Sequence, residues 1–125
     1  IRNSKPAGTT QQAIADWVKK IGGRAEFAEG ALREIDLART PVTDAQLAYL
    51  GALPALKNLS LESTESGDLG MATIAKLKTL EQLNLNHTLV SDKGFAPLSA
   101  LTNLRRLTLN NTQITGEGLA VWPQL

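Results

Sequence analysis

Apolar residues recur with a period of 24 along three-quarters of the chain. Four units of this period begin at Leu32, Leu56, Leu80 and Leu104. Three and five residues after each start comes an apolar pair, such as Leu59 and Leu61, separated by a single polar or small residue. This alternation is typical of a short strand with one buried face. One unit cannot bury its own apolar face, so the units are expected to stack with their strands in a parallel sheet.

The second half of each unit has apolar residues three positions apart. In the first unit these residues are Leu47, Leu50 and Leu53. The spacing suits a helix or a 3₁₀ turn that packs one stripe inward. Thr43 and Gln46 are placed as in a capping box, and Ser91 with Asp92 is expected to open the helix of the third unit similarly. Each unit is therefore predicted as strand, turn, short helix and return.

One polar residue is as regular as the leucines. A Thr stands eight residues after each start, at Thr40, Thr64, Thr88 and Thr112. Its hydroxyl is expected to bond the backbone of the turn that follows the strand, with the methyl group packed inward. The second unit has Ser66, Gly67 and Asp68 where Val-Thr-Asp is expected, so a looser turn is predicted there.

The repeated pattern L-x-x-L-x-L-x-x-T-x-[VI]-[ST]-D-x-x-L-x-x-L-x-x-L, seen at 32–53 and again at 80–101 with Phe95 in place of one Leu, resembles a leucine-rich repeat. The length of 24 and the Thr resemble bacterial members related to the cysteine-containing subtype. The resemblance implies an α/β fold, a right-handed solenoid of four repeats with parallel strands on the concave face. These repeats would span 32–55, 56–79, 80–103 and 104–125. The family usually binds another macromolecule on its concave face.

The residues before the repeats are expected to form a flexible leader over 1–9 and an N-terminal cap over 10–31. Thr9 and Gln12 are spaced as a capping box, and the helix that follows is expected to end at Gly22 and Gly23. Its apolar face consists of Ile14, Trp17, Val18 and Ile21. Such a helix would shield the leucine column of the first repeat from water.

A short strand is predicted between this helix and the first repeat. Ala25 and Phe27 alternate with Arg24 and Glu26, and a turn at 29–30 leads into the strand of the first repeat. The cap is therefore expected to contain a helix and a hairpin.

No comparable cap is visible at the other end. The last unit stops at Leu125, two residues short of a full period, and Trp122 stands in a column held elsewhere by Leu or Ile. Three expectations remain open: further sequence or another domain that covers this face, an end shielded by Trp122, or self-association of copies through this face.

The composition and the net charge argue against several classes of protein. The chain has 125 residues with a formal net charge of +1, 42% apolar and 20% charged residues, which fits one globular domain. Only two Trp, one Tyr and two Phe accompany 21 Leu, so the core is aliphatic. The near-neutral charge argues against nucleic-acid binding, and no apolar run is long enough for membrane insertion.

Candidate chemistry is sparse. Without Cys there are no disulfides or thiol nucleophiles, and a lone His87 cannot complete a metal site. We expect no catalytic residue, no cofactor and no metal. A first residue other than Met and the absence of Cys do not fix the compartment, but they slightly favour a periplasmic or secreted protein over a cytoplasmic one.

The outward side chains of the predicted strands and of the turns after them form the candidate site. They are Glu34, Asp36, Arg39, Asn58, Ser60, Glu62, Gln82, Asn84, Asn86, His87, Arg106, Thr108 and Asn110. This surface offers many hydrogen-bonding groups but no Trp or Tyr anchor. It is interpreted as a polar docking face of modest affinity, and the alternative is a solvated sheet whose polarity only keeps the protein soluble.

The sequence thus predicts a non-enzymatic interaction module that binds a protein partner, with a glycan as an alternative ligand. A second hypothesis is the targeting or recognition segment of a larger secreted bacterial effector or enzyme. A third is a structural repeat protein that associates with itself near Trp122.

Overall fold

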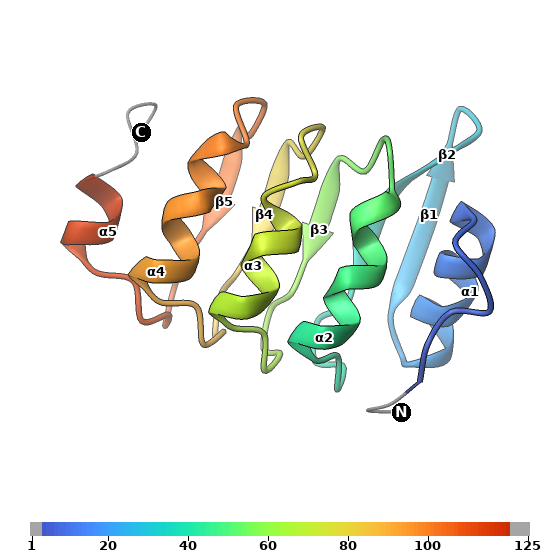
Figure 1. The fold of residues 1–125 in the computed structure, drawn as a ribbon, viewed down its shortest axis with the longest axis horizontal. Helices are drawn as coiled ribbons and strands as arrows, with labels where there is room; N and C mark the ends of the chain where they lie inside the picture. The colour runs from blue at the N-terminus through green and yellow to red at the C-terminus, as the bar shows by residue number, and fades with distance from the viewer. Residues whose placement is uncertain (1–3, 121–125) are drawn as a thin grey trace.

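The structure is a computed structural model that describes residues 4–120. It has an α/β fold with one five-stranded sheet in the order β1-β2-β3-β4-β5 and helices over one face of that sheet (Figure 1). The strands are β1 (Arg24–Ala28), β2 (Ala31–Asp36), β3 (Asn58–Ser60), β4 (Gln82–Asn84) and β5 (Arg106–Thr108). The helices are α1 (Gln11–Lys20), α2 (Asp44–Leu47), α3 (Asp68–Ile74), α4 (Asp92–Phe95) and α5 (Gly116–Ala120), with 3₁₀ helices η1 (Ala48–Ala52) and η2 (Ala96–Ala100).

The sheet is mostly parallel, and its register follows the period of the sequence. β1 runs antiparallel to β2, whereas β2 to β5 are parallel to one another. Ile35 pairs with Leu59, Leu59 with Leu83, and Leu83 with Leu107. Each step equals one unit of the sequence, so equivalent positions lie side by side, as the stacking prediction requires.

The N-terminal end of the sheet is covered by α1, β1 and the segment before them. Ile14, Trp17 and Val18 of α1 are buried. Thr10 is the N-cap and its hydroxyl accepts from the Ala13 N–H at 3.1 Å, so the capping box predicted one residue earlier, at Thr9, was wrong. The hairpin was predicted correctly, because β1 and β2 meet in a tight turn at 29–30.

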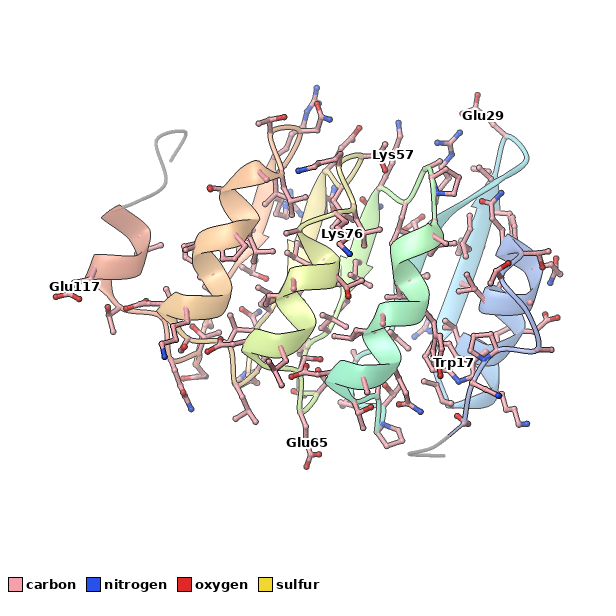
Figure 2. The ribbon with its side chains drawn as sticks, viewed as in Figure 1. Trp17, Glu29, Lys57, Glu65, Lys76 and Glu117 are labelled. Carbon is pink, nitrogen blue, oxygen red and sulfur yellow. The ribbon has the colours of Figure 1, made fainter. Side chains whose placement is uncertain are left out.

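The segment expected to be a flexible leader is attached to the rest of the protein from Ser4 onward. The Trp17 indole N–H donates to Ser4 Oγ at 3.0 Å, and the Gln46 side-chain amide donates to the Ser4 carbonyl oxygen at 3.0 Å. Pro6 is buried. These contacts connect Ser4 to α1, whose Trp17 is labelled in Figure 2, and to α2.

The turns after the strands are built as the Thr column predicted. Each Thr hydroxyl donates to the carbonyl oxygen three residues earlier, at 2.8, 2.7, 2.7 and 3.0 Å along the four units. The second turn is not left loose. Ser66 is fully buried and hydrogen-bonded to the Thr64 hydroxyl at 2.8 Å, and the Gly67 N–H donates to Asp44 Oδ1 at 2.8 Å.

The starts of α2 and α4 differ in the hydrogen bonds that their N-cap side chains make. The Thr43 and Gln46 capping box is present. Ser91 makes no such cap, and its hydroxyl donates instead to Asp68 Oδ2 at 2.5 Å. Ser91 is the N-cap residue of α4, so the predicted helix start was correct, but the expected capping bond is absent because this hydroxyl bonds the preceding unit.

An aspartate at the start of each of the first three short helices binds the next unit. Asp44, Asp68 and Asp92 accept the backbone N–H groups of Gly67, Ser91 and Thr115 at 2.8, 2.7 and 2.8 Å. A glycine two residues after the start of the next helix makes room for each carboxylate. A Cβ at Gly70 would stand 2.6 Å from Asp44 Oδ1, and one at Gly94 would stand 2.7 Å from the Asp68 Cα. We call these paired residues the Asp–Gly ladder.

The core is a continuous, mostly aliphatic layer between the sheet and the helices, with Trp17 and Phe95 as its aromatic members. In the first three units the repeated leucine positions are almost fully buried. In the fourth unit Leu104, Leu107, Leu109 and Ile114 are only partly buried. Trp122, which the sequence placed at this end, lies outside the described residues. Within residues 4–120, no helix has the length and apolar character that crossing a membrane requires.

Candidate binding face

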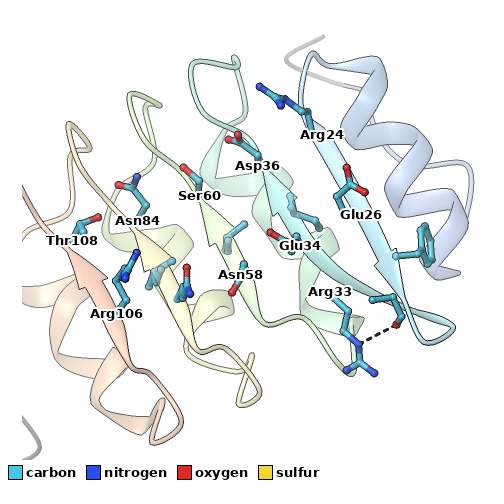
Figure 3. Close-up of a pocket in the computed structure, with 16 residues that line it drawn as sticks. Arg24, Glu26, Arg33, Glu34, Asp36, Asn58, Ser60, Asn84, Arg106 and Thr108 are labelled. Atoms are coloured by element: carbon cyan, nitrogen blue, oxygen red, sulfur yellow. Dashed lines mark hydrogen bonds between the residues drawn. The ribbon is translucent and has the colours of Figure 1, made fainter.

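The face of the sheet that carries no helices is hollowed. A cavity of about 710 Å³ lies over β1 to β5 and is open to solvent (Figure 3). We call this surface the open sheet face. It is the surface on which the sequence placed the candidate site, and it also includes outward side chains of the cap strand β1.

Strand pairing arranges the outward side chains of this face in two rows. The Glu34 row consists of Glu26, Glu34, Asn58, Gln82 and Arg106. The Asp36 row consists of Arg24, Asp36, Ser60, Asn84 and Thr108. All ten side chains line the cavity. The two rows look alike in sequence but differ in their hydrogen bonds.

The Asp36 row is largely used to build the turns. Asp36 Oδ1 accepts from the Ala38 N–H at 2.9 Å, and Asn84 Oδ1 accepts from the Asn86 N–H at 2.9 Å. Ser60 Oγ makes the equivalent, longer contact to the backbone N–H two residues on, at 3.4 Å. Short polar side chains commonly bond the backbone two residues ahead in this way. These residues therefore stabilise the fold before they contact any partner.

Thr108 interrupts this arrangement. The Asn110 N–H, which would be its local donor, goes instead to Asn86 Oδ1 at 2.7 Å. Within residues 4–120, Thr108 Oγ1 is buried without a hydrogen-bond partner. A buried hydroxyl without a partner is costly, so the Asp36 row is less well satisfied at β5 than at β2 and β4.

The candidates at the rim of the open sheet face also have internal contacts. Glu62 accepts from the Asn84 side-chain amide at 3.0 Å and lies 3.7 Å from the Arg39 guanidinium. The Asn111 side-chain amide lies 3.2 Å from His87 Nδ1, in hydrogen-bond contact. Arg39 and His87 have φ of 59° and 58° at equivalent turn positions. His87 thus occupies a left-handed turn position that His and Asn tolerate better than most residues.

The Glu34 row is the part of the face that remains available. Among residues 4–120, no side chain of this row makes a hydrogen bond or an ion pair within the protein. Glu34, Gln82 and Arg106 are exposed and Asn58 is half-buried. The row runs from two carboxylates over β1 and β2, through two amides, to the guanidinium of Arg106 on β5. It is therefore a polar strip with opposite charges at its two ends.

Sequence reasoning missed the contribution of β1 and its neighbourhood. Arg24 and Glu26 extend the two rows because β1 pairs with β2 and their side chains face the same way as those of Asp36 and Glu34. Their alternation with Ala25 was a signal that could have found them. Phe27 gave no such signal, because a register shift between Glu26 and Phe27 leaves its side chain 42% exposed at the edge of the cavity.

No group of three or more His, Cys, Asp or Glu side chains that could hold a metal ion occurs within residues 4–120. Comparison of the chain with protein-family models gives no match, and comparison with curated proteins gives none either.

Proposed function

We propose that the chain is a leucine-rich repeat module without enzymatic activity that binds a protein partner through its open sheet face. The sequence pattern and the parallel register of one unit per strand support the repeat assignment. Helices on one face and a hollowed polar strip on the other support the assignment of the binding surface.

The observation that carries this proposal is the contrast between the two rows. The Asp36 row lies next to the turns and bonds them, so the Glu34 row is the part of the face whose polar groups a partner can reach without breaking an internal hydrogen bond. The proposal narrows the site from thirteen candidates to Glu34, Asn58, Gln82 and Arg106, with Glu26 added. Asp36, Ser60, Glu62, Asn84 and Asn86 are assigned to support of the fold.

Affinity capture with defined variants tests the proposal. The wild type, Arg106→Glu and Gln82→Ala are immobilised and exposed to an extract of the source cells, and captured proteins are quantified. Both variants should lose the partner while keeping the wild-type Tm, because both side chains are exposed and make no internal bonds. Lys76→Glu is the matched control, since it makes the same charge change on an exposed residue that follows α3 on the helical side (Figure 2). Retention of every captured protein by both variants would contradict the proposal.

A second candidate function is self-association through the fourth unit. The partial burial of Leu107 and Leu109 and the 42% exposure of Leu119 favour it. Sedimentation of the wild type and of Leu119→Glu tests this idea: a dimer that dissociates in the variant supports it, and monomers in both exclude it. The hypothesis that the module belongs to a larger secreted effector or enzyme stays a prediction.

A further inference from the structure

We propose that the Glu34 row binds an extended peptide that lies across the strands, with a basic side chain at the β1–β2 end and a carboxylate at the β5 end. The inference rests on the proposed binding function and specifies its partner. It is drawn from three features of the open sheet face: free amides, opposite end charges and an exposed aromatic ring.

The amides supply the contact to the peptide backbone. Asn58 and Gln82 are Cα partners on β3 and β4, so their side chains are neighbours in the middle of the row. A primary amide presents a donor and an acceptor side by side. An extended peptide has an N–H and a C=O at each residue that match this pair. Because neither side chain is bonded within residues 4–120, neither has to give up an internal hydrogen bond.

The charges define the ends of the bound segment. Glu26 and Glu34 are Cα partners, so two carboxylates lie together at one end of the row. Arg33, which is close in sequence, does not neutralise them with a short ion pair, because its guanidinium donates to the carbonyl oxygens of Ala28 and Ala55 at 3.2 and 3.3 Å. At the other end, the Arg106 guanidinium suits a carboxylate, which it can hold with two parallel hydrogen bonds.

The length of the row sets the spacing of the two charges in the peptide. Three strand steps separate Glu34 from Arg106, which is roughly 14 Å at the usual strand spacing. An extended chain rises about 3.3 Å per residue, so the basic and acidic residues should be about four to six positions apart.

One further group lies at the β1–β2 end of the row. Phe27 follows Glu26 in β1, is 42% exposed at the edge of the cavity and offers an apolar surface to a peptide side chain. A neutral glycan would use the amides but would leave the opposite end charges without a role, so the face fits a peptide better.

A peptide array provides the test. The probes are immobilised ten-residue peptides with one arginine and one aspartate, one to eight positions apart, and mixed alanine, serine and valine elsewhere. Labelled full-length chain should bind best at separations of about four to six, and roughly tenfold less when the two charges are adjacent. Equal binding at all separations would overturn the proposal.

The Arg106→Glu variant sharpens the test because it should change the preference and not only the strength. It should bind the arginine–aspartate peptides roughly tenfold less than the wild type. It should also bind peptides with two arginines, at the same separation, better than the wild type binds them. Gln82→Ala should weaken binding to both peptide sets, whereas Lys76→Glu should bind as the wild type does. A uniform loss in Arg106→Glu without the change of preference would contradict the proposal.

Two outcomes separate this inference from the proposed function. If no array peptide binds while Arg106→Glu still loses its captured protein partner, the peptide mode fails and the binding function stands. If Arg106→Glu changes neither the array pattern nor the captured proteins, both fail.

Discussion

The two ends of the sheet differ in how completely their apolar columns are covered. At the N-terminal end, Ile35 is 2% exposed because β1 and α1 pack over the first unit. Leu83, which has a unit on each side, is 1% exposed, whereas the equivalent Leu107 of the fourth unit is only partly buried. Neighbouring units therefore supply most of the burial of each column, and the short strands alone do not.

The Asp–Gly ladder also differs between the two ends of the sheet, because each terminal unit lacks one of the two ladder residues. The first unit has Asp44 but carries Gln46 where later units have the glycine. Gln46 fits there because no carboxylate arrives from the cap, and its amide bonds Ser4 and the start of its own helix. The fourth unit has Gly118 but carries Gly116 where earlier units have the aspartate. Glycine is thus needed only where a preceding aspartate must fit.

The largest effect should come from replacing a single leucine of one column by alanine. The same substitution is made in the third unit and in the fourth unit. Leu83→Ala removes a fully buried side chain and should cost about 3 kcal/mol of the free energy of unfolding. Leu107→Ala should cost about 1 kcal/mol, because part of that side chain is already exposed to water. Urea unfolding of both variants measures the difference. Equal losses would mean that the fourth unit is as well covered as the third, contrary to the comparison.

A smaller effect should come from alanine substitutions at two glycines, one that accommodates a ladder aspartate and one that does not. A Cβ at Gly94 would stand 2.7 Å from the Asp68 Cα, whereas a Cβ at Gly116 would have nothing within 4 Å. Gly94→Ala should therefore destabilise the protein by about 2 kcal/mol through overpacking. Gly116→Ala should leave it unchanged or stabilise it by up to about 1 kcal/mol, because alanine favours the helix. Thermal unfolding distinguishes the two, and a neutral Gly94→Ala would show that the backbone at Asp68 moves aside without cost.

The smallest effect concerns the pH dependence of the last ladder contact. The hydrogen bond from the Thr115 hydroxyl, and next that from its backbone N–H, hold the pKa of Asp92 below its ordinary value, and desolvation opposes them. A lowered pKa in the folded state stabilises the protein above the unfolded-state pKa, and this contribution is lost as the pH falls through the folded-state pKa. Thr115→Val should raise the pKa of Asp92 toward its ordinary value in an NMR titration. An unchanged titration would show that the contact does not persist in solution.

Much of the fold could be predicted from the sequence because the same local signals occur four times. The strand at 58–60 and the Thr64 turn each depend on residues within one unit, so periodicity was sufficient to find them. The ladder was not found, although both its columns recur in the sequence. Asp68 and Gly94 lie in different units at unlike positions, and only the packing of neighbouring helix starts brings them together.

The position of the candidate face could be predicted from the sequence, but its division into two rows with different hydrogen bonds could not. Ser60 and Asn58 are both polar, flank the same buried leucine, and point to the same side of the sheet. What separates them is the distance to the turn, since Ser60 lies within reach of the N–H two residues ahead. Phe27 could not be placed because its exposure follows from a register shift that strand alternation does not encode.

The most direct test of the central claim, that the Glu34 row binds while the Asp36 row supports the fold, is an NMR titration of side-chain amide signals. The ¹⁵N-labelled chain is titrated with the array peptides whose charges are five positions apart. The amide signals of Asn58 and Gln82 should shift, whereas that of Asn84, bonded to Glu62, should stay in place. Shifts confined to Asn84, or to backbone signals of the helical side, would contradict the account.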